Sequence, residues 1–351
     1  MKRRTFFKAC GLTSASLLTA NYSWATTGAD YKRNPAIKPI IGSWFEFEHT
    51  SVAEGKYWNP ALRKFTTEQW KAKVKEIKEA GMEYLVLMSV AYDGKTYYPS
   101  KLAPQHDFAC TDPLEAVLSA ADECGIKFFI SNDFWGDWAD SGNMMTDPAI
   151  AKIREKGMEE TAEKYSHHKS FYGWYFPNES GLFNTIDETT TQYVNNCSRI
   201  ARKLVPHSIN LIAPYGTKSV RANDDYVRQL EKLDIDIMAY QDEIGVKKTK
   251  AGTAGKYYEA LYKAHMKAGR ARLWADMEVF EFEADVYKSA LLPAPFDRVL
   301  KQMEDISLFV EHILIYQYMG IMNKPGSLAP AGHPDAEMLY TGYTNWLKAQ
   351  R

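Results

Sequence analysis

Apolar segments rich in β-branched and aromatic residues recur along the chain at intervals of roughly 40 residues, the length of one strand–helix unit with a generous loop. Patterns of helical period separate them. The units share no common sequence template, which argues against a solenoid or propeller. One strand alternating with one helix eight times predicts the α/β class and a single (β/α)8 barrel. The eight expected strands lie at 39–47, 83–90, 127–135, 171–179, 209–215, 235–241, 272–280 and 312–319.

Helix boundaries between these strands carry recognisable signals. Thr66 and Gln69 have the spacing of a capping box. Each of the two Asp-Pro pairs, at 112–113 and 147–148, is typical of an N-cap followed by proline at the first helical position. These signals support a helix after the first, second and third strands.

The first 25 residues have the features of an export signal. Arg3 and Arg4 precede an apolar run at 9–20, and the segment 23–25 offers a cleavage site with small residues. The Phe-Phe-Lys that follows the arginine pair favours a twin-arginine signal, with an ordinary secretory signal as the alternative. We therefore expect a signal peptide at 1–25, one barrel domain at 26–351, and a periplasmic or extracellular location.

Composition excludes several classes of protein. Hydrophobic residues make up 45% and charged residues 25% of the 351 residues, which is typical of a globular domain. The formal net charge of -1 argues against a nucleic-acid-binding surface. No later segment approaches 18 consecutive apolar residues, so we expect no membrane contact after signal cleavage. We also expect the protein to be a monomer. The three cysteines after the signal, Cys110, Cys124 and Cys197, are expected to be buried thiols.

The active site of a (β/α)8 barrel forms at the carboxyl ends of its strands. In this chain those ends combine carboxylates, amides and aromatic rings, and Phe, Trp and Tyr together reach 13% of the residues. Carboxylates for acid and nucleophile, with rings that stack on sugar faces, are typical of a glycoside hydrolase cleft. The expected substrate-binding residues are Trp44, Glu46, Asp133, Trp135, Trp138, Asn178, Tyr215, Tyr240, Gln241, Asp242, Trp274 and Tyr316.

Two of these carboxylates stand out by position. Glu179 ends the fourth strand and Glu278 ends the seventh, so they are expected to face each other across the mouth of the barrel as a catalytic pair. Strand alternation then predicts that Asp276 and Trp274 also point inward. The same reasoning, applied to the sixth strand with Asp242 as the inward reference, points Tyr240 inward. It also places Asp236 and Arg272 low in the barrel, where we expect the two charges to pair.

The chain also resembles a known family. The segments 173–179 and 240–245 are similar to a bacterial barrel family catalogued as domain of unknown function 4434. Asn178 and Glu179 after strand four, with Glu278 after strand seven, resemble the acid/base and nucleophile positions of the large clan of retaining (β/α)8 glycosidases. The resemblance implies that Glu179 is the acid/base, Glu278 the nucleophile, and Asn178 the ligand of the sugar 2-hydroxyl. It also implies that Tyr240 hydrogen-bonds the nucleophile.

Several alternatives stay open. The sequence departs from the clan in carrying Glu46 at the end of strand one and Tyr316 in place of the common Trp on strand eight. An inverting glycosidase with Asp242 or Glu243 as the base is one alternative, and a non-catalytic carbohydrate-binding barrel is another. No ligand spacing indicates a metal site and no glycine-rich loop indicates a phosphate cofactor, so we expect neither. The pair at 167–168, His-His, is expected to be a solvated helix end.

Overall fold

The computed structural model describes residue 34 and residues 36–179, 181–182 and 184–351. The expected signal peptide at 1–25 lies outside this part of the chain. Eight parallel strands close into a barrel in the order β1-β12-β9-β8-β7-β6-β5-β2, which confirms the predicted (β/α)8 fold. These strands are β1 (Ile40–Phe45), β2 (Tyr84–Leu87), β5 (Lys127–Ser131), β6 (Phe171–Tyr175), β7 (Ile209–Ile212), β8 (Ile237–Gln241), β9 (Arg272–Glu278) and β12 (Ile313–Tyr316).

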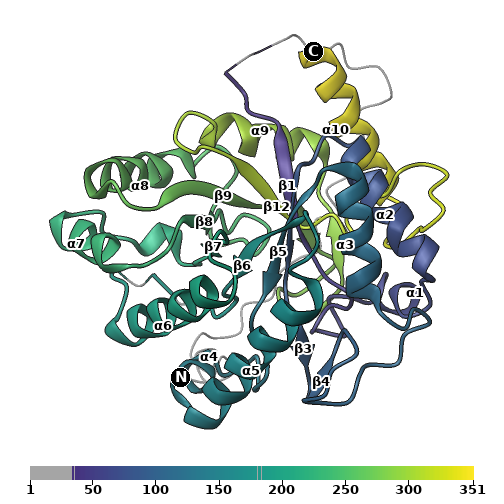
Figure 1. Ribbon diagram of the computed structural model, residues 1–351. Helices are drawn as coiled ribbons and strands as arrows, with labels where there is room; N and C mark the ends of the chain where they lie inside the picture. The colour runs from purple at the N-terminus through teal and green to yellow at the C-terminus, as the bar shows by residue number, and fades with distance from the viewer. Residues whose placement is uncertain (1–33, 35, 180, 183) are drawn as a thin grey trace.

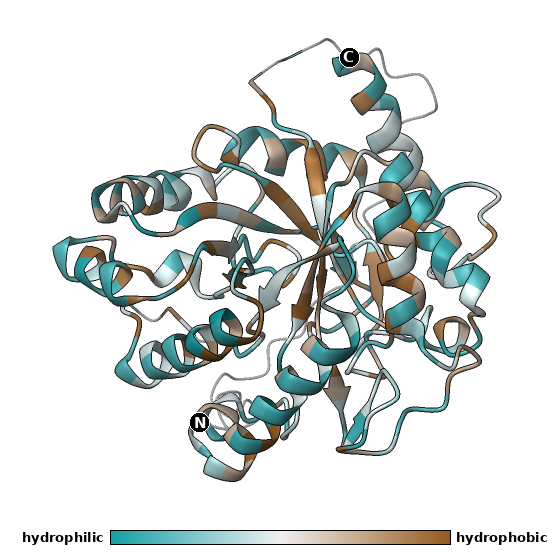
Figure 2. Cartoon of the chain, in the orientation of Figure 1, coloured by the Kyte–Doolittle hydropathy of each residue, from teal (hydrophilic) through white to brown (hydrophobic). Residues whose placement is uncertain are grey.

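Helices surround the barrel, and the hydrophobic residues concentrate on the central strands (Figures 1 and 2). The helices are α1 (Asn59–Leu62), α2 (Thr67–Glu79), α3 (Pro113–Cys124), α4 (Ser141–Thr146), α5 (Pro148–Tyr165), α6 (Glu188–Leu204), α7 (Asp224–Lys232), α8 (Gly255–Ala268), α9 (Phe296–Ile306) and α10 (Ala336–Gln350). Two short hairpins, β3 (Ala91–Tyr92) with β4 (Lys95–Thr96) and β10 (Phe280–Phe282) with β11 (Leu291–Pro293), extend from the carboxyl ends of β2 and β9.

The predicted helix starts are confirmed atom by atom. Thr66 Oγ1 accepts from the Gln69 amide at 3.3 Å, and Gln69 Oε1 accepts from the Thr66 amide at 3.0 Å, which completes the capping box of α2. Asp112 and Asp147 cap α3 and α5 through their side-chain oxygens. These caps satisfy amides that have no partner inside the helix.

Large side chains fill the interior of the barrel. Trp44, Phe129, Tyr175 and Trp274 are all at most 1% exposed and pack together there. β6 approaches β7 so closely that a Cβ atom on Gly173 would lie 1.8 Å from the carbonyl oxygen of Ile209, so only glycine fits at this position. The interior of the barrel below the rim is therefore a packed core.

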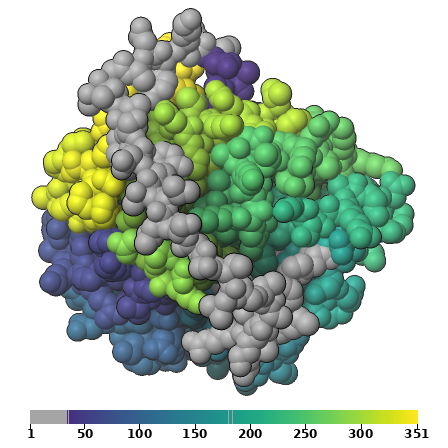
Figure 3. Space-filling view, turned by 180° about the vertical axis from the view of Figure 1, so that it is seen from behind, coloured from purple at the N-terminus to yellow at the C-terminus, as the bar shows by residue number. Residues whose placement is uncertain are grey.

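The two ends of the described chain meet on one side of the barrel. Figure 3 shows the yellow C-terminal residues beside purple N-terminal ones. The Tyr343 hydroxyl on α10 donates to the Ile40 carbonyl on β1 at 2.9 Å. Among the described residues no helix is long and apolar enough to cross a membrane. Cys110 and Cys197 are buried free thiols as predicted, whereas Cys124 is free but only half-buried.

Candidate active site

A cavity of about 360 Å³ opens at the carboxyl ends of the strands. This is the end at which barrel active sites form. Its lining includes the predicted catalytic pair, Glu179 after β6 and Glu278 at the end of β9. Six of the expected substrate-binding residues line it with them: Glu46, Trp138, Asn178, Tyr215, Gln241 and Tyr316.

Glu278 lies on the cavity wall close to other carboxyl groups. The side chain is buried, and its Oε2 accepts from the Val246 amide at 2.8 Å. Burial and the charge of Asp242 together raise the pKa of Glu278 well above its usual range. Arg298, partly buried beside it, donates to the Glu278 carbonyl at 2.9 Å. A positive charge is therefore held close to this carboxyl group, although it does not cancel the effect of burial.

Asp242 supports Glu278 from behind and does not line the cavity. Its Oδ1 accepts from the Glu278 amide at 3.1 Å and the Ile244 amide at 3.2 Å, and its Oδ2 accepts from Gln302 Nε2 at 2.6 Å. Burial raises its pKa to about 6 despite these donors. The expectation that Asp242 contacts substrate is wrong, because its side chain points toward α9 and fixes the backbone of the strand end.

The inward and outward faces of β8 are the reverse of the predicted ones. Gln241 pairs with Asp276 across β8 and β9, so Gln241 is the residue that points into the barrel. Tyr240 points outward to the helices, where its hydroxyl lies 2.7 Å from Tyr226 Oη and 2.8 Å from His265 Nε2. Tyr240 therefore cannot hydrogen-bond the proposed nucleophile. The expectations that Tyr240 hydrogen-bonds the nucleophile and that it binds substrate are therefore both wrong.

The expected pairing of Asp236 with Arg272 fails for the same reason. Asp236 lies on the helix side of the barrel and contacts Arg202 on α6 at 3.2 Å. Arg272 lies over the Trp274 ring and is 3.8 Å from Glu311. Both charges are partly solvated, so neither needs a buried partner.

Three of the four predicted tryptophans lie away from the cavity. Trp44 and Trp274 point inward as expected, but they belong to the packed barrel interior below the cavity. Trp135 packs against α5, where a Cβ atom on Gly157 would lie 2.3 Å from its ring. The expectation that these three rings bind substrate is wrong, since large side chains are needed to fill the barrel and its first helical layer. Trp138 does line the cavity.

Asp133 is a support for Asn178 and not a cavity residue. It is fully buried, and its Oδ2 accepts from Arg154 Nε at 2.5 Å, from Asn178 Nδ2 at 2.7 Å and from the Tyr193 hydroxyl at 3.2 Å. The substrate role expected for it is therefore corrected. Because Asp133 takes the Asn178 amide group, the Asn178 Oδ1 is left as a buried acceptor with no partner in the described part of the chain.

The wall formed by β1 and β12 holds a second hydrogen-bonded group. Glu46 Oε1 accepts from Trp58 Nε1 at 3.0 Å and from Gln317 Nε2 at 2.5 Å. The Tyr316 hydroxyl lies 3.3 Å from His49 Nε2. Glu46 and Tyr316 are thus held in fixed positions on one side of the cavity.

Sequence reasoning missed several cavity residues. Val246 lines the cavity after β8, and Tyr287 reaches it from the loop between β10 and β11. Glu243, which the sequence offers only as the base of an inverting enzyme, also lines the cavity and pairs with Lys248 at 3.0 Å. Loop residues of this kind follow no strand or helix period, so no pattern identifies them. Asp276 was predicted to point inward but not to bind, and it too lines the cavity.

Asp276 is the most unusual group on the cavity wall. It is 2% exposed, and its Oδ1 has no hydrogen-bond partner among the described residues. Burial raises its pKa well above 3.8, and the charges of Glu278, Asp242 and Glu179 raise it further. Asp276 is therefore a carboxyl group that holds its proton more tightly in the folded chain than in the unfolded chain.

This proton gives a pH-dependent stability prediction. As the pH rises above 3.8, the unfolded chain releases the Asp276 proton first. The stability that Asp276 contributes is therefore present below 3.8 and is lost as the pH rises through its raised folded pKa. Asp276→Asn should have a higher melting temperature than the wild type at pH 8, with the difference shrinking toward pH 4. Thermal unfolding across this range measures it, and a difference independent of pH would contradict it.

Solved structures with the same fold cover nearly the whole chain. A candidate alpha-L-fucosidase from Bacteroides thetaiotaomicron is 16% identical, with a TM-score of 0.69 over 95% of this chain and 100% of that one. An endo-1,4-beta-mannanase from Rhizomucor miehei is 11% identical, with a TM-score of 0.57 over 88% and 95%. A GH5_18 variant from Streptomyces cattleya in complex with Manb1-4GlcNAc is 14% identical, with a TM-score of 0.54 over 88% and 81%.

At these identities the likeness establishes the barrel fold. A search of curated protein sequences gives no match to this chain. A family profile, in contrast, matches residues 40–329, which span the barrel from β1 to the loop after β12. The chain therefore belongs to the family described as domain of unknown function (DUF4434).

Proposed function

We propose that this protein is a secreted retaining glycoside hydrolase that cleaves a polysaccharide or oligosaccharide in the periplasm or outside the cell. The observation that carries the proposal is the placement of Glu179 and Glu278. They follow β6 and β9 and line one cavity at the carboxyl ends of the strands. Two carboxyl groups on either side of one bond are what glycoside hydrolysis needs.

The cavity also has the surface that a sugar ring requires. Trp138, Tyr215, Phe280 and Tyr316 supply aromatic rings for stacking. The buried Oδ1 of Asn178 is an acceptor ready for a sugar hydroxyl, as the family resemblance implies. Two of the structural neighbours are described as a fucosidase and a mannanase, which are named for different sugars. They support a carbohydrate substrate but do not indicate which sugar it contains.

In the proposed mechanism Glu179 begins protonated and gives its proton to the leaving-group oxygen. Glu278 attacks the anomeric carbon, and the bond to the leaving group breaks. Glu179 then takes a proton from water, which attacks the glycosyl–enzyme bond and restores Glu278 as a carboxylate. Glu278 has to be ionised to attack, and burial with the Asp242 charge opposes this by raising its pKa, whereas the Val246 amide and the Arg298 charge favour the ionised form.

The two residues considered as the base of an inverting enzyme, Asp242 and Glu243, differ in their access to the cavity. Asp242 is held by Gln302 and two backbone amides behind the strand end, so it has no access to a water beside the sugar. Glu243 lines the cavity, but its Oε1 is paired with Lys248 at 3.0 Å. Of these two residues, Glu243 is therefore the better candidate for the base of an inverting enzyme.

The test is a screen of defined glycans with analysis of the products. Retention at the anomeric carbon, observed by NMR in the first minutes of cleavage, is the expected result. Inversion would refute the retaining assignment and point to Glu243. Binding of a glycan by calorimetry, with no cleavage by the wild type over days, would favour the non-catalytic carbohydrate-binding barrel.

A further inference from the structure

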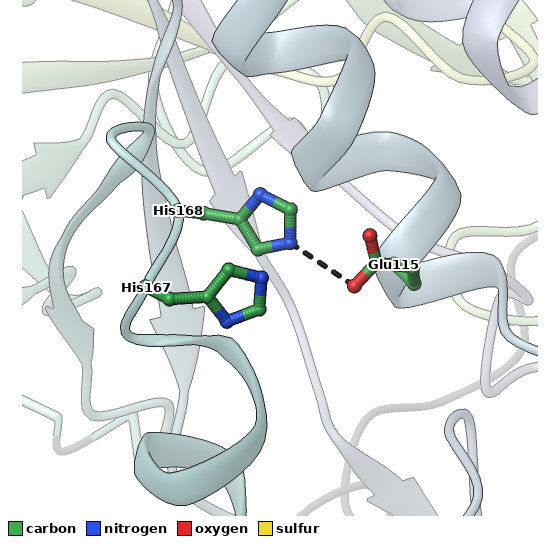
Figure 4. A group of neighbouring side chains, drawn as sticks. All are labelled: Glu115, His167 and His168. Carbon is green, nitrogen blue, oxygen red and sulfur yellow. Dashed lines mark hydrogen bonds and ion pairs between the residues drawn. The ribbon is translucent and has the colours of Figure 1, made fainter.

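A cluster of histidine and carboxylate side chains lies outside the cavity, beside the segment that joins α5 to β6. This segment precedes the strand, so it lies at the end of the barrel opposite the cavity. Figure 4 shows His168 and His167 with their rings side by side and Glu115 of α3 facing His168. The expected solvated helix end is wrong for His168, which is 7% exposed, whereas His167 is exposed.

Asp122 holds the His168 ring in one orientation. His168 Nδ1 lies 2.8 Å from Asp122 Oδ2, and the other oxygen of Asp122 accepts from the Ser170 amide at 2.6 Å. A carboxylate beside Nδ1 requires a proton on that nitrogen. In the neutral ring the lone pair is therefore on Nε2.

The Nε2 atom in turn faces a second carboxylate. It lies 3.0 Å from Glu115 Oε2. A lone pair and a carboxylate oxygen at this distance repel each other unless a positive charge lies between them. The site therefore attracts a cation, either a proton or a metal ion.

His167 supplies a third ligand. One ligand atom from each of Glu115, His167 and His168 can be chosen so that all lie within 4.8 Å of one another. The two imidazole rings have centroids 4.2 Å apart. Ligands at 2.0–2.2 Å on a tetrahedral zinc ion are about 3.3–3.6 Å apart. The 3.0 Å pair has to open only slightly, and exposed His167 is free to turn toward the ion.

We propose that Glu115, His167 and His168 bind a divalent transition-metal ion, best matched by zinc, with a water molecule as the fourth ligand. Two imidazoles and one carboxylate form a ligand set that zinc accepts. Asp122 orients His168 through the nitrogen that does not bind the metal, an arrangement that strengthens zinc–histidine sites. Bound zinc ties α3 to the segment before β6, so the ion stabilises the barrel and takes no part in the proposed hydrolysis.

Calorimetry of the untagged, chelator-treated protein with zinc chloride at about pH 7.5 tests the proposal. One ion should bind per chain, with a rise in melting temperature. His167→Ala should weaken binding at least tenfold, and Asp122→Asn about 10–100-fold. His207→Ala, which changes another exposed histidine, is the matched control and should leave binding unchanged.

Two further measurements distinguish zinc binding at the proposed site from nonspecific zinc binding. Cobalt in place of zinc should give the intense visible absorption of a four-coordinate site in the wild type and lose it in His167→Ala. Lowering the pH to about 5.5 should weaken binding, because the proton competes for His168 Nε2. Absence of saturable binding at millimolar zinc, or equal binding by His167→Ala, would overturn the proposal.

Discussion

Glu278→Gln should lower kcat/KM by at least about 10³-fold, which corresponds to about 4 kcal/mol of lost transition-state stabilisation. Glutamine has nearly the same shape, and its side-chain oxygen can still accept from the Val246 amide that now holds Glu278 Oε2 at 2.8 Å. It cannot attack the anomeric carbon to form the glycosyl–enzyme bond. Initial-rate kinetics on a glycan found in the product screen measure the effect.

Stability separates a lost nucleophile from a damaged fold. Glu278 is buried with Asp242 and Asp276, and like charges in one buried region oppose folding. Glu278→Gln should therefore unfold at the same temperature as the wild type or at a higher one at neutral pH. Glu281→Gln is the matched control, because Glu281 lies three residues along the chain but contacts Arg298 at 3.9 Å and is partly solvated. Near-normal turnover by Glu278→Gln would refute its role as nucleophile.

The barrel could be predicted because its signals are local and repeated. Each strand is a short apolar run, and most are followed by a helix whose start is fixed by a cap such as Thr66 or Asp112. The strand ends then had to meet at one rim, and this placed Glu179 and Glu278 on one cavity. The general position of the site thus follows from topology alone.

The orientation of individual strands was harder to predict. On β9 the apolar residues Leu273, Ala275 and Met277 alternate with Trp274 and Asp276, so one face is recognisable. β8 is apolar or aromatic on both faces, because the barrel core covers one and the helices cover the other. The pairing of Gln241 with Asp276 determines which residues of β8 point into the barrel, and the sequence does not show this pairing. For this reason the sequence pattern wrongly predicts that Tyr240 and Asp242 face the cavity.

The position of a tryptophan along its strand explains why Trp44 and Trp274 do not line the cavity. Trp44 lies two residues before Glu46, and Trp274 four residues before Glu278, so each is several ångströms below the rim at about 3.3 Å per residue. At that depth the barrel is filled by side chains and no sugar can enter. The predicted substrate role of Asp133 is wrong for a different reason. Its partner Arg154 comes from α5, 21 residues away, and no sequence pattern links the two residues.

Glu179→Gln should give losses that depend on the leaving group. The substitution removes the proton donor, which contributes about 10²–10⁴-fold to cleavage of a bond with a poor leaving group. An activated aryl glycoside of the same sugar leaves without a proton, so the kcat/KM for its first step should stay within about tenfold of the wild-type value. The glycosyl–enzyme should then accumulate, because Glu179 is also the base that activates water in the second step.

Added azide supplies the discriminating observation. As a small anionic nucleophile it needs no general base, so it should restore turnover of the aryl glycoside by Glu179→Gln and give a glycosyl azide with retained configuration. Glu243→Gln is the matched variant on the same cavity and should leave the first step and the stereochemistry unchanged. A Glu179→Gln enzyme that loses the activated and the natural substrate equally would contradict the acid/base role. An azide product of inverted configuration would instead show that Glu278 forms no covalent intermediate.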